Sequence, residues 1–302
     1  YLIELHVEGN FYNHGDAMLN EVTFTGSGIQ EFSSTPGMIR EADIGNAKPD
    51  GNVVVVDDLN LTNCELYFND NEIHLQDADM YADGGQINSI IIHGNGNDLT
   101  MQNGGFFWDV YFKDITLKNN VGGRGTSNTF ENVTVEDTLS RGGNVYGDIE
   151  ITVKGTLQNN GYIDSDHDSH DFVFFVEDTI VNNGVFMAEK IQFSGNGTRY
   201  IQSLAGNEFE LELLYNPEVR VPAEGISDLL LKNAEMNFNG HELNLPAAGL
   251  LQLDNTEMDD VMINAGENAV ITGLNESVIK FSTIDGALLF GNFEIHEDNI
   301  FK

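Results

Sequence analysis

The stretch GGQINSIIIHGNGNDLTMQNGGFFWDVYFKDITLKNNVGGRGTSNTFENVTVEDTLSRGG, residues 84–143, contains four glycine pairs at a nearly constant spacing. The pairs begin at Gly84, Gly104, Gly122 and Gly142, which are 20, 18 and 20 positions apart. Between them lie short apolar runs broken by Asn, Asp and Gly, which accept the positive φ of tight turns. A period of about 20 residues with several short strands is typical of a parallel β-helix, whose stacked turns share one core.

The rest of the chain follows the same pattern. Long segments with apolar residues at helical spacing are nearly absent, and short strand-like runs recur, such as residues 22–24, 90–92, 149–153 and 229–231. We therefore predict an all-β chain that forms a single right-handed parallel β-helix of about 14 turns. Asparagines at the turns are expected to stack along the axis, with each amide bonded to the next turn. A β-sandwich is the alternative, because it also uses short strands.

A second, longer repeat relates residues 59–75 to residues 229–245, which are 170 positions apart. We predict two tandem β-solenoid units, residues 1–169 and residues 170–302, of which the second is incomplete and both belong to a longer array. Cys64 aligns with Ala234, so we expect a small buried side chain at that position rather than a reactive thiol. His74 aligns with Asn244, which weakens it as a catalytic residue.

The composition excludes several classes of partner. The 302 residues include 13 Lys and Arg against 49 Asp and Glu, which gives a formal net charge of −36. Nucleic acid is excluded as a partner because phosphate binding needs a basic surface. Anionic membrane surfaces are disfavoured for the same reason, and no apolar run is long enough to cross a membrane as a helix. The single Cys excludes a disulfide framework within the chain. The acidic excess favours a secreted, extracellular protein.

Two segments, residues 11–32 and 180–204, share an Asn-x-Gly pattern followed by Phe-x-Gly-x-Gly. Together with the Asn-rich residues 59–75 and 229–245, this pattern resembles the repeats of large secreted surface proteins of Bacteroidetes-type bacteria. The resemblance implies export by the type IX secretion system, display at the cell surface and a β-solenoid stalk or adhesin without shared catalytic residues. It also implies that the partners are further repeats of the parent chain or another surface protein.

The densest cluster of potential metal ligands is the segment DSDHDSHD, residues 164–171. Its alternating carboxylates, Asp164, Asp166 and Asp168, followed by Asp171, offer the hard oxygen ligands that Ca²⁺ requires. The match to an EF-hand ends there, because Ser169 replaces the expected Gly and Phe175 the bidentate Glu. A solvated acidic turn is the alternative interpretation. We predict no required cofactor, with Ca²⁺ as the candidate ion.

Aromatic residues are densest in FFWDVYF, residues 106–112, which holds the only Trp of the chain. Half of such a strand faces the core and the other half faces solvent. The outward aromatic rings could pack against the apolar faces of sugars. Phe107, Trp108 and Tyr111 are therefore the candidate glycan-binding residues, and simple packing is the alternative role.

No catalytic site stands out in the sequence. A polysaccharide lyase needs Lys or Arg beside the substrate carboxylate, and the cations here are few and scattered. An inverting hydrolase needs two carboxylates about 6.5–9.5 Å apart, but with 49 acidic residues no pair can be singled out. We predict a non-enzymatic cell-surface stalk or adhesin segment, with glycans or Ca²⁺ as candidate ligands. A carbohydrate-binding module or a polysaccharide-degrading β-helix enzyme is the alternative.

Overall fold

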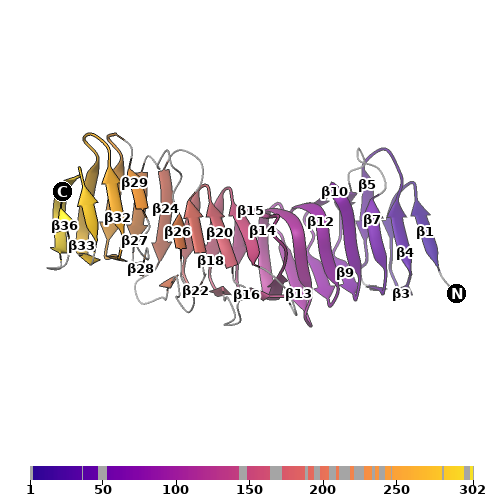
Figure 1. Cartoon of the computed structure of the whole chain (residues 1–302). Coiled ribbons are helices and arrows are strands. Elements are labelled where there is room, and N and C mark those ends of the chain that lie inside the picture. The colour runs from indigo at the N-terminus through magenta and orange to yellow at the C-terminus, as the bar shows by residue number, and fades with distance from the viewer. Residues whose placement is uncertain are drawn as a thin grey trace. The chain divides into compact units, whose positions relative to one another are not determined.

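The computed structural model describes most of the chain (Figure 1), with its gaps concentrated in the second half. The described residues are 3–35, 37–46, 53–142, 148–163, 172–187, 190–193, 198–203, 209–210, 218–220, 228–232, 235–237, 242–245, 247–280, 282–295 and 300–301. They contain strands and turns, and no helix occurs among them. The chain divides into two compact units, Tyr1–Ile149 and Glu150–Lys302.

The first unit is built from three parallel ladders, because each turn of the chain contributes one strand segment to each ladder. The first ladder stacks β1 (Glu4–Val7), β4 (Glu21–Phe24), β7 (Asp43–Asn46) and the starts of β10 (Glu65–Leu75), β12 (Gln86–His93) and β14 (Phe106–Gly123). The second ladder stacks β2 (Phe11–Tyr12), β5 (Gln30–Ser33), β8 (Val53–Val55), the later parts of β10, β12 and β14, and β15 (Asn128–Val135). The third stacks β3 (Ala17–Met18), β6 (Ile39–Arg40), β9 (Leu59–Thr62), β11 (Met80–Asp83), β13 (Asp98–Gln102) and the last part of β14, which also pairs with β16 (Thr138–Arg141).

The long strands turn the corners between ladders without a break in strand structure. In β14 the corner residues Asp109, Asp114 and Asn119 have φ values of 52°, 50° and 61°. In β10 the corner is Asn69-Asp70, also with positive φ. Asn and Asp tolerate this left-handed conformation better than other non-glycine residues because their short polar side chains can bond locally. The many Asn and Asp residues of the sequence therefore set where each turn bends.

The core of the first unit lies inside the three ladders and is filled by alternate residues of each strand. Phe107 and Phe112 lie on β14, Phe130 lies on β15 of the next turn, and all three are fully buried. Their ring centroids lie 5.2 to 5.8 Å apart, within the range of favourable aromatic pairs. Cys64 is also buried, as predicted, and burial raises the pKa of its thiol.

The second unit repeats the parallel stacking, and β17 (Ile149–Val153) lies at the boundary of the two units. One ladder contains β18 (Thr156–Asn159), β21 (Thr179–Asn182), β24 (Thr198–Ser203), β27 (Asp228–Lys232), β30 (Leu250–Asp254), β33 (Val270–Lys280) and β35 (Leu288–Ile295). A second contains β19 (Tyr162–Ile163), β22 (Val185–Met187), β25 (Phe209–Glu210), β28 (Glu235–Asn237) and β31 (Glu257–Asp259). The remaining strands form two series, β20 (Phe172–Val176), β23 (Lys190–Phe193) and β26 (Glu218–Arg220), and β29 (Glu242–Leu245), β32 (Met262–Ala265), β34 (Thr283–Asp285) and β36 (Ile300–Phe301).

Buried asparagines link successive turns, as the sequence predicted. The Nδ2 of Asn159 donates to the Oδ1 of Asn182 in the next turn at 2.8 Å, and both side chains are fully buried. The Nδ2 of Asn182 in turn donates to the carbonyl of Gly184 at 2.9 Å. Because a buried amide without partners is costly, such ladders favour one register of the stacked turns.

The prediction of an all-β parallel solenoid is confirmed, and the β-sandwich alternative is not supported because the described pairings are parallel. The predicted count of about 14 turns is wrong, since the structure gives about ten. The length of a turn varies along the first ladder. Paired residues of the first ladder lie 17 positions apart at Glu4 and Glu21 but 22 apart at Asp43 and Glu65.

The predicted boundary at residues 169 and 170 lies outside the described residues and stays a prediction. Among the described residues, no helix is both long and apolar enough to cross a membrane.

Candidate functional site

A row of carboxylates runs along the outer surface of the first ladder. Glu4, Glu21, Asp43 and Glu65 occupy the same register position on β1, β4, β7 and β10. Successive members of this row lie about 4.8 Å apart along the ladder, which is the spacing of hydrogen-bonded strands. Within the described part of the chain, none of the four forms an ion pair with Lys or Arg. We call these residues the acidic row; their charge gives this surface a strongly negative potential.

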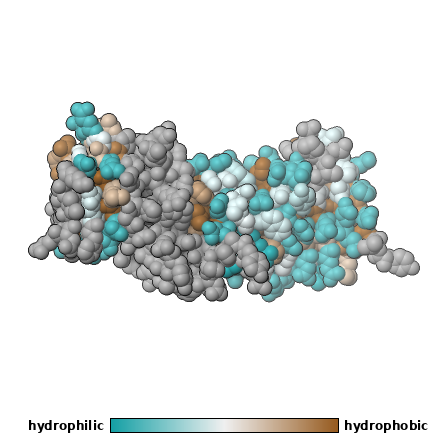
Figure 2. Space-filling view, viewed as in Figure 1, coloured by the Kyte–Doolittle hydropathy of each residue, from teal (hydrophilic) through white to brown (hydrophobic). Residues whose placement is uncertain are grey.

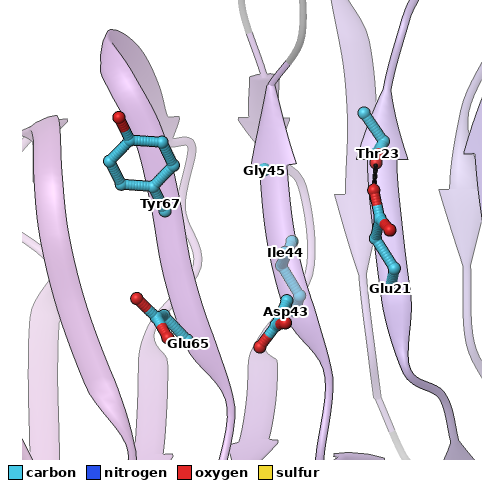
Figure 3. A pocket seen from close by; sticks show the side chains of 7 residues that line it. All are labelled: Glu21, Thr23, Asp43, Ile44, Gly45, Glu65 and Tyr67. Carbon is cyan, nitrogen blue, oxygen red and sulfur yellow. Dashed lines mark hydrogen bonds between the residues drawn. The ribbon is translucent and has the colours of Figure 1, made fainter.

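A hollow of about 380 Å³ opens beside the acidic row. Thr23, Gly45 and Tyr67 form the parallel row two residues further along the same strands. Figure 3 shows the ring of Tyr67 at the level of Gly45, with the carboxylates of Asp43 and Glu65 at the other end of the hollow. Because Gly45 has no side chain, the space between Thr23 and Tyr67 stays open. Tyr67 is 47% exposed, so its side chain can contact a ligand.

Polar groups around the hollow are held in place by their neighbours. The Oγ1 of Thr23 donates to the Oε1 of Glu21 at 2.7 Å, a bond drawn in Figure 3. The Nδ2 of Asn88, on the next turn, donates to the Oε1 of Glu65 at 2.8 Å. Each of these carboxylates keeps further acceptor positions, which can accept hydrogen bonds from hydroxyl groups.

The same ladder continues into an aromatic pair. Glu65 is followed in the register by Gln86 and then Phe106, and Tyr67 is followed by Asn88 and then Trp108. The rings of Phe106 and Trp108 stack with their centroids 5.4 Å apart. The guanidinium of Arg124 lies 3.3 Å from the centre of the Phe106 ring, a cation–π contact. Burial lowers the pKa of Arg124, although Arg stays charged at all physiological pH values.

The structure separates the three predicted glycan-binding residues. Trp108 is half-buried on the outside of the first ladder, whereas Phe107 is fully buried in the core and cannot contact a ligand. Tyr111 lies beyond the corner at Asp109 on the second ladder, where its hydroxyl donates to Glu131. Trp108 and Tyr111 therefore do not form one platform. Alternation along a strand predicts that Phe107 and Trp108 face opposite ways, but the corner could not be placed from sequence.

The other predicted site cannot be located. Asp164, Asp166, Asp168 and Asp171 lie outside the described residues, so the Ca²⁺ site there stays a prediction. Sequence reasoning missed the acidic row and the hollow. A signal existed, because Glu21, Asp43 and Glu65 recur every 22 positions, but it is weak among 49 acidic residues.

Figure 2 shows many hydrophilic side chains on the described surface of the first unit, as the acidic composition implies. Comparisons with protein-family models, with curated proteins and with solved structures gave no match.

Proposed function

We propose that this chain is a non-enzymatic segment of an extracellular stalk or adhesin and that the first ladder of its first unit binds glycan. The observation that carries the proposal is the hollow at Gly45, with an exposed Tyr67 ring on one side and the carboxylates of Asp43 and Glu65 on another. In this proposal the solenoid is a right-handed β-helix exported to the cell surface, consistent with the resemblance to type IX secretion cargo. Its other partners are further repeats or another surface protein.

The chemistry of the hollow favours a neutral sugar chain. An aromatic ring packs against the apolar face of a sugar, and carboxylates accept strong hydrogen bonds from sugar hydroxyls. An anionic polysaccharide would instead place its uronate groups beside the acidic row, at a cost in electrostatic free energy. Trp108 lies on the same ladder, two turns beyond Tyr67. A chain that runs across the strands could therefore reach both rings.

A polysaccharide hydrolase is the second candidate, because carboxylates of the acidic row lie on neighbouring turns. Stacked strands are about 4.8 Å apart, close to the roughly 5–5.5 Å between the carboxyl groups of retaining glycosidases. A lyase is less well supported, because the residues that line the hollow include no Lys or Arg. Incubation with any bound glycan separates the two functions: a hydrolase generates new reducing ends, and a binding protein does not.

Replacing Tyr67 by alanine is expected to weaken glycan binding by about tenfold or more, because loss of the stacking ring costs about 1.4 kcal/mol. A glycan array first identifies a neutral ligand, and calorimetry then measures its affinity for each variant. Tyr81→Ala is the matched control, since Tyr81 is also partly exposed but lies on the third ladder. Unchanged affinity of Tyr67→Ala would refute a site at the hollow.

A further inference from the structure

Two histidines and a glutamate meet on the outside of the second ladder, away from the hollow. Glu72 and His74 lie on β10, and His93 lies on β12 in direct register with His74. Their potential ligand atoms all lie within 4.8 Å of one another. All three side chains are partly exposed, at 42% for Glu72, 30% for His74 and 23% for His93, so the cluster lies at the surface.

The distances between the ligand atoms are close to those of a metal centre. The Oε2 of Glu72 lies 3.1 Å from the Nε2 of His74 and 3.6 Å from the Nε2 of His93. Tetrahedral Zn²⁺, with bonds of about 2.0–2.1 Å, separates its ligand atoms by about 3.3 Å. The two imidazole rings are parallel, with centroids 4.3 Å apart. A small tilt of the rings would bring both nitrogens onto one ion.

One of these two ring nitrogens lacks a hydrogen bond. The Nε2 of His93 is buried and makes no hydrogen bond within the described part of the chain, because the Oε2 of Glu72, at 3.6 Å, lies just beyond hydrogen-bond distance. A buried polar atom without a partner costs free energy, and coordination to a metal would satisfy it. The next residue in the register, Lys113, does not compete for the site, because its Nζ pairs with the Oε1 of Glu131 at 2.7 Å.

We propose that Glu72, His74 and His93 bind a divalent transition-metal ion of the Zn²⁺ class. Two imidazoles and one carboxylate are a recurrent Zn²⁺ ligand set that leaves a fourth position open for water or for another ligand. Ca²⁺ is not the expected ion, because it is bound through oxygen ligands. The bound ion ties together two successive turns, and it is independent of the glycan proposed for the hollow.

Titration of the full chain with ZnCl₂, followed by calorimetry, tests the site. We expect binding of one ion that is weakened at least about tenfold in both His93→Gln and Glu72→Gln. His6→Gln is the matched control, since His6 is exposed on the first ladder, outside this cluster. Addition of Ca²⁺ in excess should not displace the zinc.

A second measurement does not depend on whether the variants fold. In the wild-type protein with ¹⁵N-labelled histidine, zinc should shift the ring-nitrogen resonances of His74 and His93 and leave those of His6 unchanged. Absence of zinc binding, zinc binding of wild-type strength in His93→Gln, or ring shifts confined to other histidines would each overturn the proposal.

Discussion

Replacing Phe112 by alanine is expected to lower the free energy of unfolding of the first unit by about 3–5 kcal/mol. The ring of Phe112 is fully buried and contacts those of Phe107 and Phe130, so its loss leaves a cavity bounded by two rings. In a solenoid each turn is stabilised mainly by its neighbours, and the cavity therefore weakens the packing of this turn against the two adjacent turns, which place Ile92 and Phe130 in register with Phe112.

Urea denaturation followed by near-ultraviolet circular dichroism measures this loss. Tyr81→Ala is the control, because Tyr81 is 37% exposed and loss of its ring should cost about 1 kcal/mol or less. Equal effects of the two substitutions would mean that the interior of the ladders is not a packed core.

Replacing Gly85 by alanine is expected to destabilise the first unit by about 2–5 kcal/mol, through two separate effects. Gly85 has a φ of 86°, which costs an alanine about 1–2 kcal/mol. A Cβ atom there would also lie 2.1 Å from the carbonyl oxygen of Cys64 on the preceding turn. This backbone oxygen accepts a hydrogen bond from the amide of Gln86, so relief of the clash distorts the stacking and adds about 1–3 kcal/mol.

Gly96→Ala isolates the steric effect. Gly96 has nearly the same φ, 87°, but a Cβ atom there would meet nothing within 4 Å. Thermal unfolding of the two variants should therefore differ, with Gly85→Ala melting at the lower temperature. Equal melting temperatures of the two variants would mean that Gly85 does not lie in close contact with the backbone of Cys64.

The regular glycine pairs contained most of the information about the fold. Gly85 shows why, since its contact with the turn before it admits no side chain, and a Cβ atom at Gly122 would likewise lie 2.8 Å from the Cα of Gly142 on a neighbouring turn. The number of turns was harder to predict. Turn length varies with how many residues each corner accommodates, and a corner such as Asn69-Asp70 resembles any other polar pair in the sequence.

The candidate sites depended on register, which the sequence specifies less directly. Trp108 was found because aromatic residues are conspicuous, but its distance from Tyr111 follows from the positive φ of Asp109 between them. His74 and His93 were not paired in the sequence analysis, although 19 positions separate them, which is one turn. Asn244 occupies the position of His74 in the second repeat unit, which argues against a role that both units share. It does not argue against a site that is present in one unit alone.

The most direct test of the proposed function compares the affinity of the wild-type chain for two matched oligosaccharides. One is the neutral glycan selected on the array, and the other is the same chain with uronic acids in place of its neutral sugars. The acidic row and Tyr67 predict that the neutral chain binds at least about tenfold more tightly at low salt, and that added salt narrows the difference. Equal binding of both chains, tighter binding of the uronate form, or no binding of any glycan would contradict a neutral-glycan site at the hollow.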